Sequence, residues 1–105
     1  MNSDYHIGVQ IVKIITSNKV HKLLIEMQES NNKTVLYIAI EGYWYSRQVN
    51  SYNDPFEAYK AAIKLLNLQG VIDMHIDVAP NVAEVNEVKN TFLNEGITVN
   101  NVTET

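Results

Sequence analysis

Hydrophobic and polar residues alternate along the first half of the chain with the two-residue period of β-strands. In residues 5–16 most odd-numbered positions are apolar, which places Gln10 on the polar side. Residues 20–29 alternate in the same way, and turn-forming sequences at 17–19 and 29–33 end the two runs. The pattern predicts two strands that each bury one face.

The third run, residues 34–49, is too long for one straight strand. At about 3.3 Å per residue it would extend roughly 53 Å, whereas a domain of this size has a radius of gyration of about 13 Å. A bend is expected at Glu41-Gly42 because glycine tolerates unusual backbone angles. A two-residue hairpin there would place Tyr43 and Tyr45 on the side of the apolar Ile38. We therefore predict a single kinked strand.

Two helices and two further strands are predicted in the second half of the chain. Residues 54–57 combine a capping Asp, a Pro at the first helical position and a Glu three residues after the cap. Gly70 is typical of the residue after a helix. A second helix is expected over 81–96, from a capping Asn to a Gly, and alternation predicts strands at 71–78 and 97–102.

The predicted order of elements is β-β-β-α-β-α-β. Because each strand has one apolar face and each helix one apolar stripe, the expected class is α+β, with both helices packed on one face of a mostly antiparallel sheet. The last β-α-β unit should join two parallel strands through a crossover. A length of 105 residues predicts a single domain spanning residues 1–105.

Composition narrows the class of protein. A hydrophobic fraction of 46% indicates a folded chain, and the absence of Cys excludes disulfides, thiolate metal sites and cysteine nucleophiles. The chain begins without a basic leader, and no apolar run approaches the roughly 18 residues of a membrane span. We therefore expect a cytoplasmic protein. Thirteen Asn against a single Arg are typical of an AT-rich genome, such as that of a phage or a low-GC bacterium.

Charge is distributed unevenly along the chain. The formal net charge is −4, with +1 in residues 1–52 and −5 in residues 53–105. An acidic second half argues against broad contact with a nucleic-acid backbone and is compatible with a basic protein partner. Glu84 and Glu87 lie on the polar face of the second predicted helix, where they could contact such a partner.

Aromatic residues define the main candidate binding surface. Tyr37, Tyr43, Tyr45 and Arg47 share the outward side of the predicted kinked strand. Exposed tyrosines around an arginine are typical of protein-binding hot spots. The same rings could stack single-stranded bases, although few basic residues accompany them. Alternatively, a helix or a partner subunit covers them as part of a core.

One group of metal-ligating residues occurs in the sequence. Asp73, His75 and Asp77 alternate along one predicted strand, so they project from one face about 6.7 Å apart. They could hold a metal ion if the side chains converge, but such residues also suit the solvated face of a strand. The sequence contains neither a glycine-rich phosphate loop nor a nucleophile-elbow motif.

These features favour a small non-enzymatic binding protein without a cofactor. It would occlude or sequester a partner protein, as inhibitors, immunity proteins and anti-defence factors do. A homodimer is compatible with this reading because long strands leave edges that must be covered. Two alternatives remain: a metal-dependent phosphodiester-cleaving enzyme that uses Asp73, His75 and Asp77, and a single-stranded nucleic-acid binder that uses the aromatic sheet face.

Overall fold

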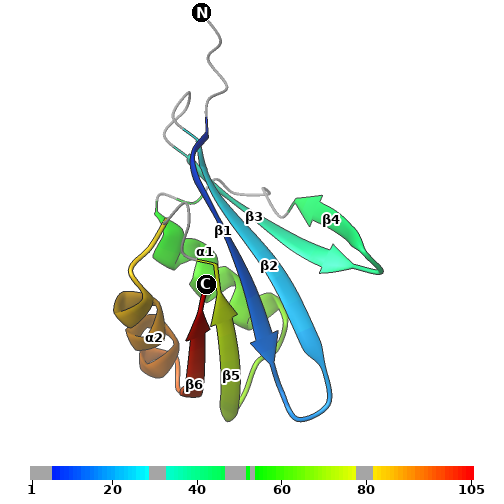
Figure 1. The fold of residues 1–105 in the computed structure, drawn as a ribbon, viewed down its shortest axis with the longest axis vertical. Helices are drawn as coiled ribbons and strands as arrows, with labels where there is room; N and C mark the ends of the chain where they lie inside the picture. The colour runs from blue at the N-terminus through cyan, green and yellow to red at the C-terminus, as the bar shows by residue number, and fades with distance from the viewer. Residues whose placement is uncertain (1–5, 29–32, 47–51, 53, 78–81) are drawn as a thin grey trace, which may run out of the picture.

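The computed structural model describes residues 6–28, 33–46, 52, 54–77 and 82–105. The elements in chain order are β1 (His6–Ile15), β2 (Val20–Gln28), β3 (Lys33–Ile40), β4 (Tyr43–Ser46), α1 (Pro55–Leu65), β5 (Val71–Ile76), α2 (Val85–Asn94) and β6 (Thr98–Glu104). The strands form one sheet in the order β4-β3-β2-β1-β5-β6 (Figure 1). Neighbouring strands are antiparallel except for β5 and β6, which are parallel. The α+β class is therefore confirmed.

Both helices lie on one face of the sheet and share a single hydrophobic core with it (Figure 1). Helix α1 packs against β2 and β3, α2 packs against β6, and the two helices contact each other. We call the opposite side of the sheet the open face. This arrangement is the two-layer packing that the amphipathic pattern predicted.

The buried side of β1 is the opposite of the predicted one. Gln10, Val12 and Ile14 are completely buried under the helices, whereas Ile11 and Ile15 lie on the open face. The prediction was wrong because the side with fewer apolar residues is the one that faces the helices, where Gln10 is hydrogen-bonded to Ala83 and Tyr59. Alternation does not show that a polar side chain finds such partners.

The predicted kinked strand is wrong: β3 and β4 are two antiparallel strands of a hairpin. Glu41 and Gly42 close a two-residue turn between β3 and β4, with φ angles of 52° and 85°. Two successive positive φ angles are the geometry of the type I′ turn, whose twist matches that of the flanking strands. Ile38 pairs with Tyr45, so the tyrosines of β4 lie on the helix side of the sheet. They remain exposed there, which the prediction did not consider.

Helix α1 begins as predicted and ends early. The Asp54 side chain accepts a hydrogen bond from the Glu57 amide at 2.9 Å, as an N-cap does. The helix ends at its C-cap, Leu66, rather than just before Gly70. Asn67 follows with a φ of 52°, and Asn is one of the few residues that adopt this left-handed conformation readily.

Helix α2 connects β5 to the parallel strand β6, as predicted. Its N-cap is Glu84, which makes no capping hydrogen bond through its side chain. The predicted cap, Asn81, lies outside the described residues. Val88 and Phe92 are buried against the core. In the part of the chain that the structure describes, neither helix has the length and apolar character needed to span a bilayer.

A buried polar network joins β1 to the helical layer. The Gln10 Nε2 donates a hydrogen bond to the Ala83 carbonyl at 3.1 Å, and the Gln10 Oε1 accepts one from the Tyr59 hydroxyl at 2.7 Å. The Tyr59 ring packs edge-on against Phe92, with ring centroids 6.0 Å apart. Burial raises the pKa of Tyr59, so its hydroxyl remains protonated and can donate. One amide thus connects the central strand to α1 and to the segment before α2.

Replacing Gln10 with Ala should lower the free energy of unfolding by about 2–4 kcal/mol, because the Tyr59 hydroxyl and the Ala83 carbonyl lose a buried partner. Urea denaturation measures this loss. Thr16→Ala is the control, because the Thr16 hydroxyl also donates a hydrogen bond, to the Lys19 carbonyl at 3.1 Å, but in an exposed position. It should cost less than about 1 kcal/mol, and equal losses for the two variants would contradict the network's importance.

Candidate functional site

The structure separates the tyrosines that the sequence grouped together. Tyr37 lies on the open face, whereas Tyr43 and Tyr45 lie on the helix side. The separation follows from the hairpin. A continuous strand would place residues 37, 43 and 45 on one side of the sheet. The two-residue turn instead pairs Tyr45 with Ile38, so Tyr43 and Tyr45 lie on the side opposite to Tyr37. Arg47 lies outside the described residues. The predicted surface of three tyrosines around an arginine therefore does not form on one face of the described sheet.

Tyr37 interacts with a neighbour on its own sheet face. Its hydroxyl hydrogen-bonds to the carboxylate of Glu26, which also accepts the 2.7 Å bond from the Gln28 Nε2. Burial, and then the negative charge of Glu26, raise the pKa of Tyr37. Glu26 is almost fully buried, so these donors supply the hydrogen bonds that its carboxylate needs. Tyr37 therefore has a structural role in the sheet.

Glu84 and Glu87 form a separate surface. They are exposed at the first turn of α2, which packs on β6 at the edge of the sheet opposite to β4 (Figure 1). Carboxylates are favourable there because they complement the positive end of the helix dipole. The two glutamates and the β4 tyrosines cannot contact the same small region of a partner.

Asp73, His75 and Asp77 share the open face of β5 and the residue that follows it, as the alternation predicted. One Asp73 oxygen accepts hydrogen bonds from the Asn101 amide at 3.2 Å and from the Asn101 Nδ2 at 3.3 Å. Among the described residues, no group of three or more His, Cys, Asp or Glu side chains is placed to hold a metal ion.

Three consecutive exposed aromatic residues occupy β4. Tyr43 and Tyr45 are 70% and 49% exposed on the helix side, and Trp44 is 39% exposed on the open face. The Lys22 ammonium lies 5.8 Å from the centroid of the Trp44 ring, a cation–π distance. Strand β4 is the terminal strand of the sheet, so these side chains lie beside a strand edge that pairs with no other described strand. We call Tyr43, Trp44, Tyr45 and this edge the β4 edge.

Among the described strands, β3 is the one neighbour of β4, and it pairs with the inner side of the β4 backbone. In a two-residue hairpin the residues that flank the turn, here Ile40 and Tyr43, form a hydrogen-bonded pair. The alternation of the antiparallel ladder then turns the amide and carbonyl of Trp44 away from β3. No other described strand pairs with this side of β4.

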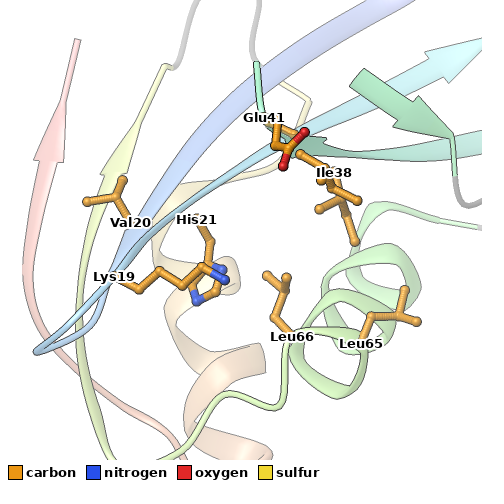
Figure 2. Close-up of a pocket in the computed structure, with 9 residues that line it drawn as sticks. Lys19, Val20, His21, Ile38, Glu41, Leu65 and Leu66 are labelled. Carbon is orange, nitrogen blue, oxygen red and sulfur yellow. The ribbon is translucent and has the colours of Figure 1, made fainter. Parts of the chain in front are cut away.

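A pocket of about 520 Å³ opens next to the hairpin, between the end of α1 and the facing ends of β2 and β3 (Figure 2). Its apolar lining includes Ile38 and Ile40 from β3 and Leu65 and Leu66 from the end of α1. Ile38 and Ile40 pair with Tyr45 and Tyr43 on the same side of the sheet. The pocket and the two tyrosines therefore lie on the same side of the sheet.

Polar groups of the pocket lie on β2, directly before it and at the β3–β4 turn. Burial, and then the nearby Lys19 ammonium, lower the pKa of His21. Its imidazole is therefore neutral near pH 7 and offers one donor and one acceptor. Lys19 and Glu41 are exposed at the rim (Figure 2). An apolar cavity with a few polar groups is typical of a binding site.

The sequence analysis missed the pocket residues. Ile38, Ile40 and Leu66 have the periodicity of core positions, and His21 stands alone in a strand. The sequence carried one usable signal, the Glu41-Gly42 pair, because a turn that contains glycine between two alternating segments indicates a hairpin. Comparison of the chain with protein-family models, with curated proteins and with solved structures finds no significant match.

The turn that presents β4 is the basis of a stability prediction. Asn is favoured over Glu at the first position of a type I′ turn, so Glu41→Asn should raise the free energy of unfolding by about 0.5–1 kcal/mol. Gly42→Ala should lower it by about 1 kcal/mol. A Cβ at position 42 would meet no atom within 4 Å, so that loss reports backbone strain alone. Urea denaturation checks both values, and an unchanged Glu41→Asn variant would argue against this turn type.

Proposed function

We propose that this chain is a non-enzymatic protein-binding domain whose β4 edge captures an extended segment of a partner. The observation that carries this proposal is the run of three exposed aromatic residues on a terminal strand. Natural proteins usually protect such edges with charges, proline or a covering segment, because an exposed apolar edge invites pairing with another chain. Tyr and Trp are also the residue types most enriched in binding hot spots.

The captured segment would add to the sheet as a further strand. Main-chain hydrogen bonds to Trp44 would supply affinity, and side chains at alternate positions would supply specificity. Those on the helix side would cover the rings of Tyr43 and Tyr45. An apolar side chain beyond the rings would enter the pocket lined by Ile38 and Leu66.

Binding of this kind acts by occlusion and requires no cofactor. A partner segment held in the sheet cannot take part in its usual contacts, which is how an inhibitor, an immunity protein or an anti-defence factor would work. The net charge of −4 favours encounter with a basic partner. Base stacking has less support, because the aromatic residues are divided between two faces of the sheet.

Peptides selected from a displayed random library against the immobilised chain test this proposal. We expect the selected sequences to alternate apolar residues and to bind the Tyr43→Ala/Tyr45→Ala double variant at least tenfold more weakly, since each hot-spot ring contributes about 2 kcal/mol. Leu93→Ala is the matched control, because Leu93 is similarly exposed but lies on α2. Equal binding to the double variant, or no enrichment, would contradict the proposal.

A proline at position 44 tests the backbone contribution separately. Trp44→Pro removes the outward amide, and proline is tolerated on edge strands whose N–H faces solvent. The peptide should bind Trp44→Pro more weakly than Trp44→Ala, because Trp44→Ala loses the indole ring but keeps the backbone amide donor. Calorimetric titration of a selected peptide into both variants measures the difference, and thermal melting confirms that both are folded. Equal affinities would mean that the partner does not pair with β4.

A further inference from the structure

The aromatic sequence of β4 reads the same in both directions around its centre. Tyr43 and Tyr45 lie on either side of Trp44, and the strand carries no charged residue. Charged side chains are a common means by which one sheet edge repels another, and β4 lacks them. The backbone amide and carbonyl of Trp44 point away from β3. The centre of the symmetric sequence is therefore also the point at which a further strand would pair.

Two β4 strands that pair antiparallel around Trp44 match each aromatic residue with another. Trp44 lies opposite Trp44 of the second copy, and the two residues exchange both of their backbone hydrogen bonds. Tyr43 lies opposite Tyr45 of the second copy as a non-hydrogen-bonded pair, with the Cα atoms about 4.5 Å apart. Directly opposed aromatic side chains stabilise antiparallel sheets. A shift by two residues would place Trp44 opposite Ser46 and lose these matches.

The side chains of β4 lie on the faces that this pairing requires. A two-fold axis perpendicular to the sheet keeps the helix sides of both copies on one side. The exposed rings of Tyr43 and Tyr45 therefore meet those of the second copy there. On the open face the two Trp44 rings meet. The Lys22 ammonium contacts Trp44 from β2, which lies on the inner side of β4, so it does not stand between the two rings.

The other terminal strand of the described sheet, β6, has a polar edge. Its exposed polar residues include Asn100, Asn101, Thr103 and Glu104. Pairing of β4 with β6 of another copy would set aromatic side chains against these polar groups. Such head-to-tail contacts also continue from copy to copy, whereas a contact between two identical edges closes as a dimer. The contrast between the two edges favours pairing of β4 with β4.

We propose that two copies of this chain pair through their β4 strands, antiparallel and centred on Trp44, and so join their sheets across a two-fold axis. This inference rests on the strand pairing at the β4 edge proposed above, and it names a second copy as one occupant. A partner segment must displace that copy, because both use the same backbone groups of Trp44. The dimer thus keeps an aromatic edge covered until such a segment binds.

The mass in solution tests whether the copies pair. Light scattering during gel filtration, from micromolar to millimolar concentrations, should show a rise from the 11.9 kDa of one chain toward twice that mass. Trp44→Pro should remain monomeric, because proline has no amide for the central pair. Leu93→Ala, which removes an exposed apolar side chain from α2, should dimerise as the native chain does. A monomer at every concentration, or a dimer of folded Trp44→Pro, would overturn the proposal.

Disulfide cross-linking tests the register of the pair. The chain has no Cys, so disulfides form only between introduced residues. An oxidised mixture of Tyr43→Cys and Tyr45→Cys should cross-link, because paired Cα atoms about 4.5 Å apart suit a disulfide. Each variant alone should cross-link roughly tenfold more slowly, because its two cysteines lie diagonally, about 7–8 Å apart. A mixture that cross-links no faster than either variant alone would overturn this register.

A peptide selected for binding at β4 separates the dimer from the function proposed above. Added to the dimer, it should lower the measured mass toward that of one chain with one peptide, since both occupy the same edge. A dimer that persists at saturating peptide would overturn the proposal. A chain that binds the peptide through Trp44 but stays monomeric would also overturn the dimer, while the peptide-binding function would stand. A dimer that Trp44→Pro abolishes, without any enriched peptide, would support the dimer and contradict that function.

Discussion

The side-chain amide of Gln10 determines how the two layers of this molecule fit together. It reaches Tyr59 on α1 with one end and Ala83 before α2 with the other, at a position without solvent exposure. A buried amide must satisfy its hydrogen bonds, so this contact fixes which side of β1 faces the helices. The apolar residues on the other side, Ile11 and Ile15, are consequently turned away from the helices, which creates the open face.

Much of the fold follows from local sequence patterns. The Asp54-Pro55 start of α1, the α+β class and the parallel pairing of β5 with β6 were all predictable, because each depends on residues close together in the chain or on a general rule of connection. The buried side of β1 was not. Its odd-numbered side is the more apolar one, and the partners that bury Gln10 on the other side come from residues 59 and 83, which alternation does not reveal.

The candidate site was predictable only in part. Exposed aromatic residues at Tyr43 and Tyr45 were expected, and the structure exposes both. Their separation from Tyr37 depends on whether the chain reverses at Gly42 or only bends, and that choice decides on which face each ring lies. His21 and Leu66 meet in the pocket only because α1 ends beside β2 and β3, a tertiary arrangement with no signature in the sequence.

Trp44 is the single tryptophan of the chain, and it is not part of the hydrophobic core. Its intrinsic fluorescence therefore reports on the sheet edge rather than on the interior. Emission from a half-exposed indole beside the Lys22 ammonium is sensitive to any molecule that excludes water from the β4 hairpin. The protein thus carries a natural optical probe at the surface where association would occur, while loss of the core would be followed better by circular dichroism.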